Sequence, residues 1–180
     1  MSGFLNILIM SISFTLSGCY LGITGRIIDA ETQQPIEGAI VLVEWTKTHG
    51  YPFSATTSFK DEEVVSDSSG KVELSGIFNP FVNFPQVTVY KQGYVAWNSR
   101  FIFPPGYTKR TDFAWRDGYV FCLEQFRSEY KYKDHVGFIY SVVSTDNFFK
   151  LNLQKAINLE INMFRSELDE ERDRRNKLLK

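Results

Sequence analysis

From Gly22 onward, short strand-like runs recur about every ten residues, and this repeat constrains the fold more than any other feature of the sequence. The runs are rich in Val, Ile and aromatic residues, and clusters of turn-forming residues separate them. Such spacing is typical of an antiparallel β-sandwich. We expect strands over residues 23–28, 38–45, 64–66, 71–74, 87–90, 95–103 and 119–123.

One connection between these runs carries a clear turn signature, Asp67-Ser68-Ser69-Gly70. Asp and Ser side chains bond nearby backbone N–H groups, and Gly adopts the positive φ that many turns need. We therefore expect a hairpin that joins residues 64–66 to residues 71–74.

After Leu123 the hydrophobic period changes from that of a strand to that of a helix. The residues Val136, Ile139, Tyr140 and Val143 stand at i, i+3, i+4 and i+7, which predicts a short amphipathic helix. A second helix is expected from about Asp146 toward the C-terminus. Its apolar stripe advances in steps of four and three through Phe149, Leu153, Ile157, Ile161, Phe164 and Leu168.

The end of this stripe is a candidate contact for another protein. Phe164 and Leu168 would face a partner, and beyond them residues 167–180 form a charged run. Such a run is usually a solvated helical end, and partner binding is the alternative interpretation. A coiled coil is disfavoured because the stripe lasts only about three heptads.

The N-terminal segment from Phe4 to Leu16 is mostly apolar, and the sequence has no acidic residue before Asp29. About 13 residues are too few for a membrane-spanning helix but suit the core of a secretory signal peptide. The segment ends in Leu16-Ser17-Gly18-Cys19, which resembles the lipobox of bacterial lipoproteins. An uncleaved anchor or an ordinary first strand is the alternative.

The lipobox resemblance implies that Cys19 receives a diacylglyceryl group, that residues 1–18 are removed, and that acyl chains hold the protein in a membrane. Met1-Ser2-Gly3 departs from the pattern because it contains no Lys or Arg. Tyr20 follows the cysteine in place of an acidic residue that retains some lipoproteins at the inner membrane. The resemblance therefore implies an envelope protein, with the outer membrane as the favoured location.

Several motifs within residues 22–97 together resemble the carboxypeptidase regulatory-like domain. They are residues 25–32 (GRIIDAET), 35–41 (PIEGAIV), 66–72 (SDSSGKV), 87–89 (VTV) and 93–94 (GY). The resemblance implies a seven-stranded transthyretin-like antiparallel β-sandwich, and a module that binds or assists and has no catalytic residues. The expected organisation is a signal peptide at 1–18, the sandwich at 19–124 and a helical C-terminal appendage at 125–180.

Two aromatic segments depart from this family pattern. Residues 46–63 form a longer link than a hairpin needs, and residues 78–85 are punctuated by proline. Long loops are often functional, so their rings could form a binding patch for an envelope protein or a glycan. The alternative is that the rings fold down as a cap on the core. The candidate ligand-binding residues are Tyr51, Phe53, Phe59, Phe81 and Phe84.

Neither His49 nor His135 stands in a metal-binding spacing, and we predict no metal, no cofactor and no catalytic residue. A small hydrolase remains a minor hypothesis, which requires His49 and Glu62 to converge. Within Asp61-Glu62-Glu63, we expect solvated carboxylates, with a Ca²⁺ site as the alternative.

Cys122 is expected to be a buried, inert thiol, with an intermolecular disulfide as the alternative. The net charge of -1, with no concentrated basic segment, argues against a nucleic-acid partner.

Overall fold

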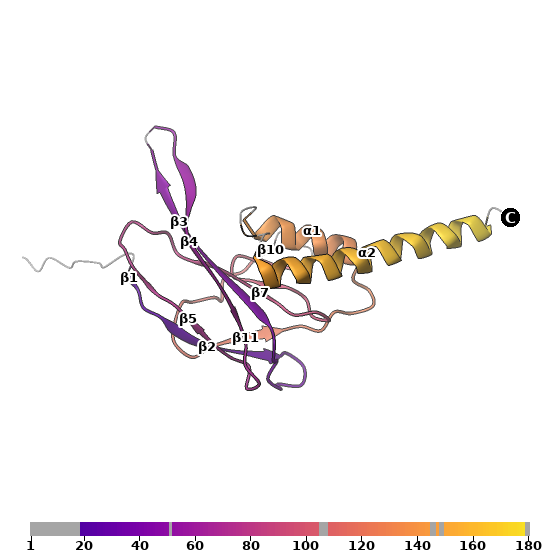
Figure 1. The fold of residues 1–180 in the computed structure, drawn as a ribbon, viewed down its shortest axis with the longest axis horizontal. Coiled ribbons are helices and arrows are strands. Elements are labelled where there is room, and N and C mark those ends of the chain that lie inside the picture. The colour runs from indigo at the N-terminus through magenta and orange to yellow at the C-terminus, as the bar shows by residue number, and fades with distance from the viewer. Residues whose placement is uncertain (1–18, 51, 105–107, 145–146, 148–149, 179–180) are drawn as a thin grey trace, which may run out of the picture.

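The computed structural model describes residues 19–50, 52–104, 108–144, 147 and 150–178. Two β-sheets pack face to face, and two helices cover the outer face of the larger sheet (Figure 1). The fold is thus mainly β with C-terminal helices, as the sequence predicts.

The smaller sheet has the order β11-β2-β5, formed by β11 (Tyr119–Leu123), β2 (Ile23–Asp29) and β5 (Lys71–Leu74). β5 runs antiparallel to β2, but β11 runs parallel to it. The prediction of a wholly antiparallel sandwich was therefore wrong at this edge. The parallel pair is held at its start, where the Thr24 N–H and hydroxyl donate to Asp117 Oδ1 at 2.7 and 2.6 Å.

The larger sheet has the order β4-β3-β7-β8 and is antiparallel throughout. Its strands are β3 (Ile40–His49), β4 (Ala55–Val65), β7 (Gln86–Tyr90) and β8 (Trp97–Asn98). The outer halves of β3 and β4 form a hairpin that projects beyond the sandwich (Figure 1). The long link expected at residues 46–63 is therefore mostly paired strand.

Two short ladders complete the described strands. β1 (Cys19–Tyr20) pairs with β6 (Ile77–Phe78), and β9 (Phe101–Ile102) pairs with β10 (Thr108–Lys109). The strand predicted over 95–103 is divided between β8 and β9. The division occurs because Asn98 Oδ1 accepts from the Arg100 and Phe101 N–H groups at 2.8 and 3.1 Å and turns the chain.

The core between the sheets follows the alternation of the strands. On β3, Val41, Val43 and Trp45 point inward and are fully buried. They meet Ile27 of β2 and Phe121 of β11 from the facing sheet. Burial of each such side chain contributes about 1.5–3 kcal/mol, so this interior is the main source of the sandwich's stability.

The turn predicted at Asp67–Gly70 is confirmed. Asp67 Oδ1 accepts from the N–H groups of Ser69 and Lys71 at 2.8 and 2.9 Å, and Gly70 has a φ of +74°. The predicted hairpin was wrong, because β4 and β5 belong to different sheets. The chain changes sheets here because the Gly70 carbonyl accepts from the Ile27 N–H of β2 at 2.8 Å.

The helices α1 (Tyr132–Val142) and α2 (Leu151–Leu178) build a second core on the outer face of the larger sheet. Leu42 and Tyr90 of the sheet pack there with Ile139 of α1 and with Leu153 and Ile157 of α2. Of the two described helices, neither combines the length and the apolar character that crossing a bilayer requires. The first half of α2 is thus packed on the sandwich, and its second half extends past it (Figure 1).

Carboxylates of the larger sheet fix the start of α2. Glu63 accepts from the Leu153 N–H at 3.0 Å and from the Asn152 side-chain amide at 2.9 Å, and Asp61 pairs with Lys150. A negative charge is favourable at the positive end of a helix dipole. The acidic cluster expected to be solvated therefore holds a helix in place.

Candidate binding site

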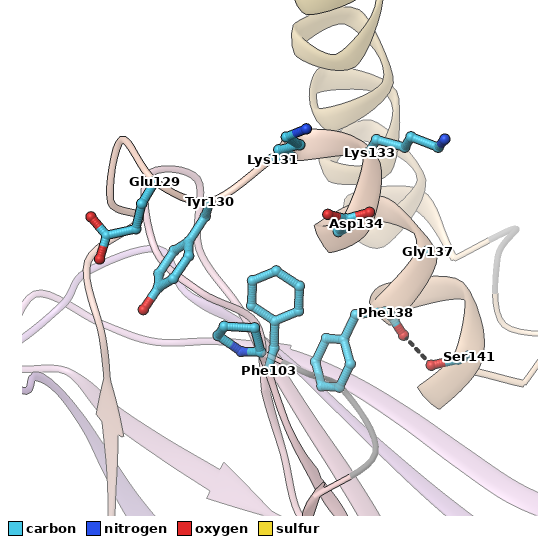
Figure 2. Close-up of a pocket in the computed structure, with 10 residues that line it drawn as sticks. Phe103, Glu129, Tyr130, Lys131, Lys133, Asp134, Gly137, Phe138 and Ser141 are labelled. Atoms are coloured by element: carbon cyan, nitrogen blue, oxygen red, sulfur yellow. Dashed lines mark hydrogen bonds between the residues drawn. The ribbon is translucent and has the colours of Figure 1, made fainter.

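An open pocket of about 720 Å³ lies where α1 meets the chain that follows β9 (Figure 2). Three aromatic rings line it, namely Phe103 after β9, Tyr130 just before α1 and Phe138 on α1. The Phe103 ring centroid lies 5.6 Å from that of Tyr130 and 5.5 Å from that of Phe138. Rings at these separations pack edge to face or tilted, which fixes their orientation.

The rings form the floor of the pocket and do not project from it. Phe103 and Phe138 are almost completely buried, so each presents only part of its ring to the opening. Tyr130 is fixed at its polar end, because its hydroxyl donates to Glu124 Oε1 at 2.7 Å. This hydrogen bond, together with burial, raises the pKa of Tyr130 above its ordinary value.

The rim of the pocket carries charges of both signs. Glu129 and Asp134 supply two carboxylates, and Lys131 and Lys133 supply two amines. Figure 2 shows the two lysine amines pointing away from the rings. The Ser141 hydroxyl donates to the Phe138 carbonyl at 2.7 Å and is thus already occupied. The rim can hydrogen-bond a polar ligand while the floor receives an apolar or ring face.

A buried polar cluster supports the floor from beneath. His135 Nε2 accepts from the Ala96 N–H at 2.8 Å, so the imidazole proton lies on Nδ1, which donates to Glu160 at 3.0 Å. The Tyr90 hydroxyl donates to the same carboxylate at 2.7 Å. Burial, together with the Glu160 charge, raises the pKa of Tyr90 well above its ordinary value. His135 also lies against Phe103, with ring centroids 5.2 Å apart.

This cluster joins α1 and α2 to β7 through saturated hydrogen bonds. Both nitrogens of His135 and both oxygens of Glu160 have partners, so the histidine is a structural group in this conformation. Among the described residues, no group of three or more His, Cys, Asp or Glu side chains is placed to hold a metal ion. The pocket offers a ligand the exposed parts of its aromatic rings and the charges of its rim.

Protein-family models and curated proteins yield no match to this sequence. Among solved structures, the chain overlaps a streptococcal ancillary pilin at 12% identity and a TM-score of 0.30, over 58% of this chain and 29% of that one. It overlaps the shaft pilin SpaA from Lactobacillus rhamnosus GG at 20% identity and a TM-score of 0.34, over 62% of this chain and 47% of that one. The chain thus spans less than half the length of either pilin, and the fold described above rests on its own sheets.

The structure places the predicted aromatic residues on the surface. Phe53 is 89% exposed and Phe81 is 79% exposed, so the alternative interpretation, in which the rings cap the core, is wrong for these two residues. Phe59 and Phe84 are about half exposed; the Phe59 ring lies 3.9 Å from Lys47 Nζ, and the Phe84 ring centroid lies 5.8 Å from that of Phe113. Tyr51 lies outside the described residues.

These aromatic residues lie at different levels along the β3–β4 hairpin. Phe53 lies at the tip of the β3–β4 hairpin, whereas the loop with Phe81 is attached nearer its base. The loop is attached by a hydrogen bond of 2.8 Å from the Asn83 N–H to the Thr46 carbonyl. Thr46 lies three residues before His49, which pairs with Ala55 at the outer end of the hairpin. Phe53 therefore lies beyond the level at which this loop is attached, whereas Phe59 follows Ser58, the strand partner of Thr46.

The geometry required by the hydrolase hypothesis is not present. His49 pairs with Ala55 near the hairpin tip, whereas Glu62 pairs with Val43 within the sandwich. Seven residues of strand separate Ala55 from Glu62, which places the two groups about 20 Å apart. Glu62 accepts from the Ser75 N–H and hydroxyl at 3.0 and 2.8 Å, so its role is to join the two sheets.

The remaining predicted residues lie on separate elements. Cys19 belongs to β1, with the leader 1–18 outside the described residues. Phe164 is half-buried and Leu168 is exposed on α2, near the point where Glu167 accepts from the Tyr132 N–H at 3.2 Å. Cys122 was expected to be buried, but it is exposed on the outer face of β11.

The pocket was not found from the sequence. Its rings are separated by 27 and 8 residues along the chain, and only tertiary packing brings Phe103 to α1. One available signal was the aromatic run that precedes α1, which contains Phe126 and Tyr130. The helical stripe was placed slightly out of register, because the buried face contains His135 and Phe138, and Tyr140 is exposed.

Proposed function

We propose that this protein is a lipid-anchored component of the bacterial envelope, and that its folded part is a non-catalytic binding module of the transthyretin-like sandwich type. The observation that carries the proposal is the apolar segment that ends in Leu16-Ser17-Gly18-Cys19. Acyl chains on Cys19 hold the module in a membrane, with the outer membrane as the proposed location. No cofactor, metal or nucleic acid takes part.

The pocket bounded by Phe103, Tyr130 and Phe138 is the proposed ligand site. Its aromatic floor and its rim of mixed charge match the combination of ring faces and hydroxyl, amide or carboxylate groups found in envelope glycans and in short peptide segments of envelope proteins. The hydrogen bonds beneath the floor support a binding role, because they occupy both nitrogens of His135 as structural contacts in this conformation.

Gly137 provides a direct test of this site. It lies on the pocket wall, and a Cβ added there meets no atom of the surrounding elements within 4 Å, so the ring of Gly137→Phe is expected to enter the pocket. Titration with peptidoglycan disaccharide-peptide fragments, followed by NMR, is expected to shift the pocket resonances of the wild type but not those of Gly137→Phe. Ser166→Phe, at an exposed site on α2, is the matched control and should bind like the wild type. Equal binding by Gly137→Phe would remove the pocket from the proposal.

A second candidate function is that of a structural subunit in an envelope assembly. It is supported by the exposed part of α2 beyond the sandwich, which carries Leu168 at 47% exposure beside the half-buried Phe164. Cross-linking in native membranes should then give a product that Leu168→Ser abolishes and Arg172→Ser retains. Recovery of the monomer alone would contradict this candidate.

A further inference from the structure

We infer that one edge of the sandwich, formed by Leu21, Phe78 and Phe81, inserts its side chains into the headgroup boundary of the membrane. This membrane-facing edge is the most exposed apolar surface near the start of the folded chain, with exposures of 80%, 84% and 79%. The inference rests on the proposed acylation of Cys19 and adds how the folded part is oriented on the lipid surface.

The first step is that no spacer separates Cys19 from the fold. Cys19 pairs with Phe78, and Tyr20 pairs with Ile77, in the β1–β6 ladder. The next residue is also fixed, because the Leu21 carbonyl accepts from the Trp115 indole N–H at 2.8 Å. A chain that begins at Cys19 therefore has its acylated residue in the strand that pairs with Phe78, and Figure 1 shows β1 at one end of the sandwich. The edge must lie at the membrane surface, since the acyl chains are buried in the bilayer next to it.

The second step is that the backbone holds these rings outward. Phe78 follows Ile77, and Phe81 precedes Val82, both of which are buried in the core. The intervening turn is fixed because the Phe81 N–H donates to Asn79 Oδ1 at 3.0 Å. Anchoring of each neighbour in the core directs the two phenylalanine rings away from the protein.

The third step is the absence of charge in the segments that form the edge. Neither residues 19–25 nor residues 74–90 contain Asp, Glu, Lys or Arg. A charged side chain resists transfer toward the acyl region, whereas Phe and Leu side chains gain free energy there. Composition and position thus agree with a lipid surface as the occupant of this edge.

The test measures contact between this edge and lipid. In a Cys122→Ser background, Phe78→Cys and Phe81→Cys each receive an environment-sensitive fluorophore, and the acylated protein is placed in phosphatidylethanolamine–phosphatidylglycerol vesicles. Ser68→Cys in the turn before β5 is the matched control, because β6 follows the opposite end of that strand. Nitroxide groups attached to the lipids are expected to quench the labels at 78 and 81 and to leave the label at 68 unquenched.

Three other outcomes separate the inference from the proposed function. If the protein is acylated and floats with the vesicles, but labels at 78 and 81 are quenched no more than the label at 68, the inference is wrong and the lipid anchor stands. If labels at 78 and 81 are shielded only in native membranes that contain other proteins, a protein covers the edge and the inference is also wrong. If the protein carries no acyl chain and stays soluble, the proposed function fails first. A label-free form of the test is hydrogen exchange at residues 77–82, which the inference predicts to be slower on vesicles than in detergent.

Discussion

Replacement of Glu160 by Ala should lower the free energy of unfolding by about 2–6 kcal/mol, because it leaves two buried donors without an acceptor. Glu160 is 2% exposed and accepts from Tyr90 and His135. Its removal leaves the Tyr90 hydroxyl and His135 Nδ1–H without acceptors, at about 1–3 kcal/mol for each. The sum of these two costs, about 2–6 kcal/mol, spans the expected loss.

Urea unfolding of the purified protein, followed by far-UV circular dichroism, measures this loss. Glu170→Ala is the matched control on the same helix, where the side chain is exposed, and should change the free energy of unfolding by less than about 0.5 kcal/mol. Glu160→Gln should lie between the two variants, because its amide keeps one acceptor and turns an N–H toward a second donor. A loss below about 1 kcal/mol for Glu160→Ala would refute the reasoning that the helices and the larger sheet share a hydrogen-bonded core.

Three further predictions concern stability. Hydrogen bonds hold the pKa of Asp29 well below its ordinary value of 3.8; the donors are Thr32 N–H, the Gln125 amide, Glu31 N–H and Tyr94 OH. The contribution of Asp29 to the free energy of unfolding is therefore complete above pH 3.8 and is lost as the pH falls toward the folded pKa. Asp29→Asn should flatten the acid side of the unfolding free energies measured from pH 7 to pH 2. Gly70→Ala should lower the free energy of urea unfolding by more than about 2 kcal/mol, because it combines a positive φ with a collision between the new Cβ and the Ile27 carbonyl. Gly93→Ala, at a φ of +83° in open space, should lower it by about 1–2 kcal/mol. Equal losses for the two variants would contradict the collision at Gly70. Gly137→Ala should raise the free energy of unfolding by up to about 1 kcal/mol, since Ala is the better helix former, and a lower melting temperature would contradict the open position of this residue on α1.

The parts of the fold that depend on local pattern were predictable. Runs of alternating or continuous Val, Ile and aromatic residues gave the strands at 23–28, 87–90 and 119–123 to within a residue or so. The Asp67–Gly70 turn followed from the side-chain chemistry of four consecutive residues. Each of these elements is determined by contacts between near neighbours, which a sequence displays directly.

The parts that depend on distant contacts were not predictable. The outer β3–β4 hairpin is polar on both faces, so its threonines and lysines carry no period that distinguishes a strand from a loop. The parallel pairing of β11 joins segments far apart in the sequence, as the hydrogen bond between Asp117 and Thr24, 93 residues earlier, shows. The binding pocket likewise requires Phe103 to reach α1, and nothing in the spacing of its lining residues indicates that they meet.

The surface role of the aromatic residues shows the same limit. Phe78 and Phe81 look like core residues by type, and only the burial of their neighbours Ile77 and Val82 shows that they point outward. The sequence identified the aromatic segment at 78–85 as unusual, but it could not show that Cys19 pairs with this segment.

The measurement that tests the central claim most directly is the intact mass and membrane partitioning of the protein expressed in a bacterium, beside a Cys19→Ala variant. The account predicts a protein that lacks residues 1–18, gains the mass of its acyl chains and partitions with membranes, and a variant that does none of these. An unmodified chain that retains residues 1–18 and remains in the soluble fraction would contradict the account.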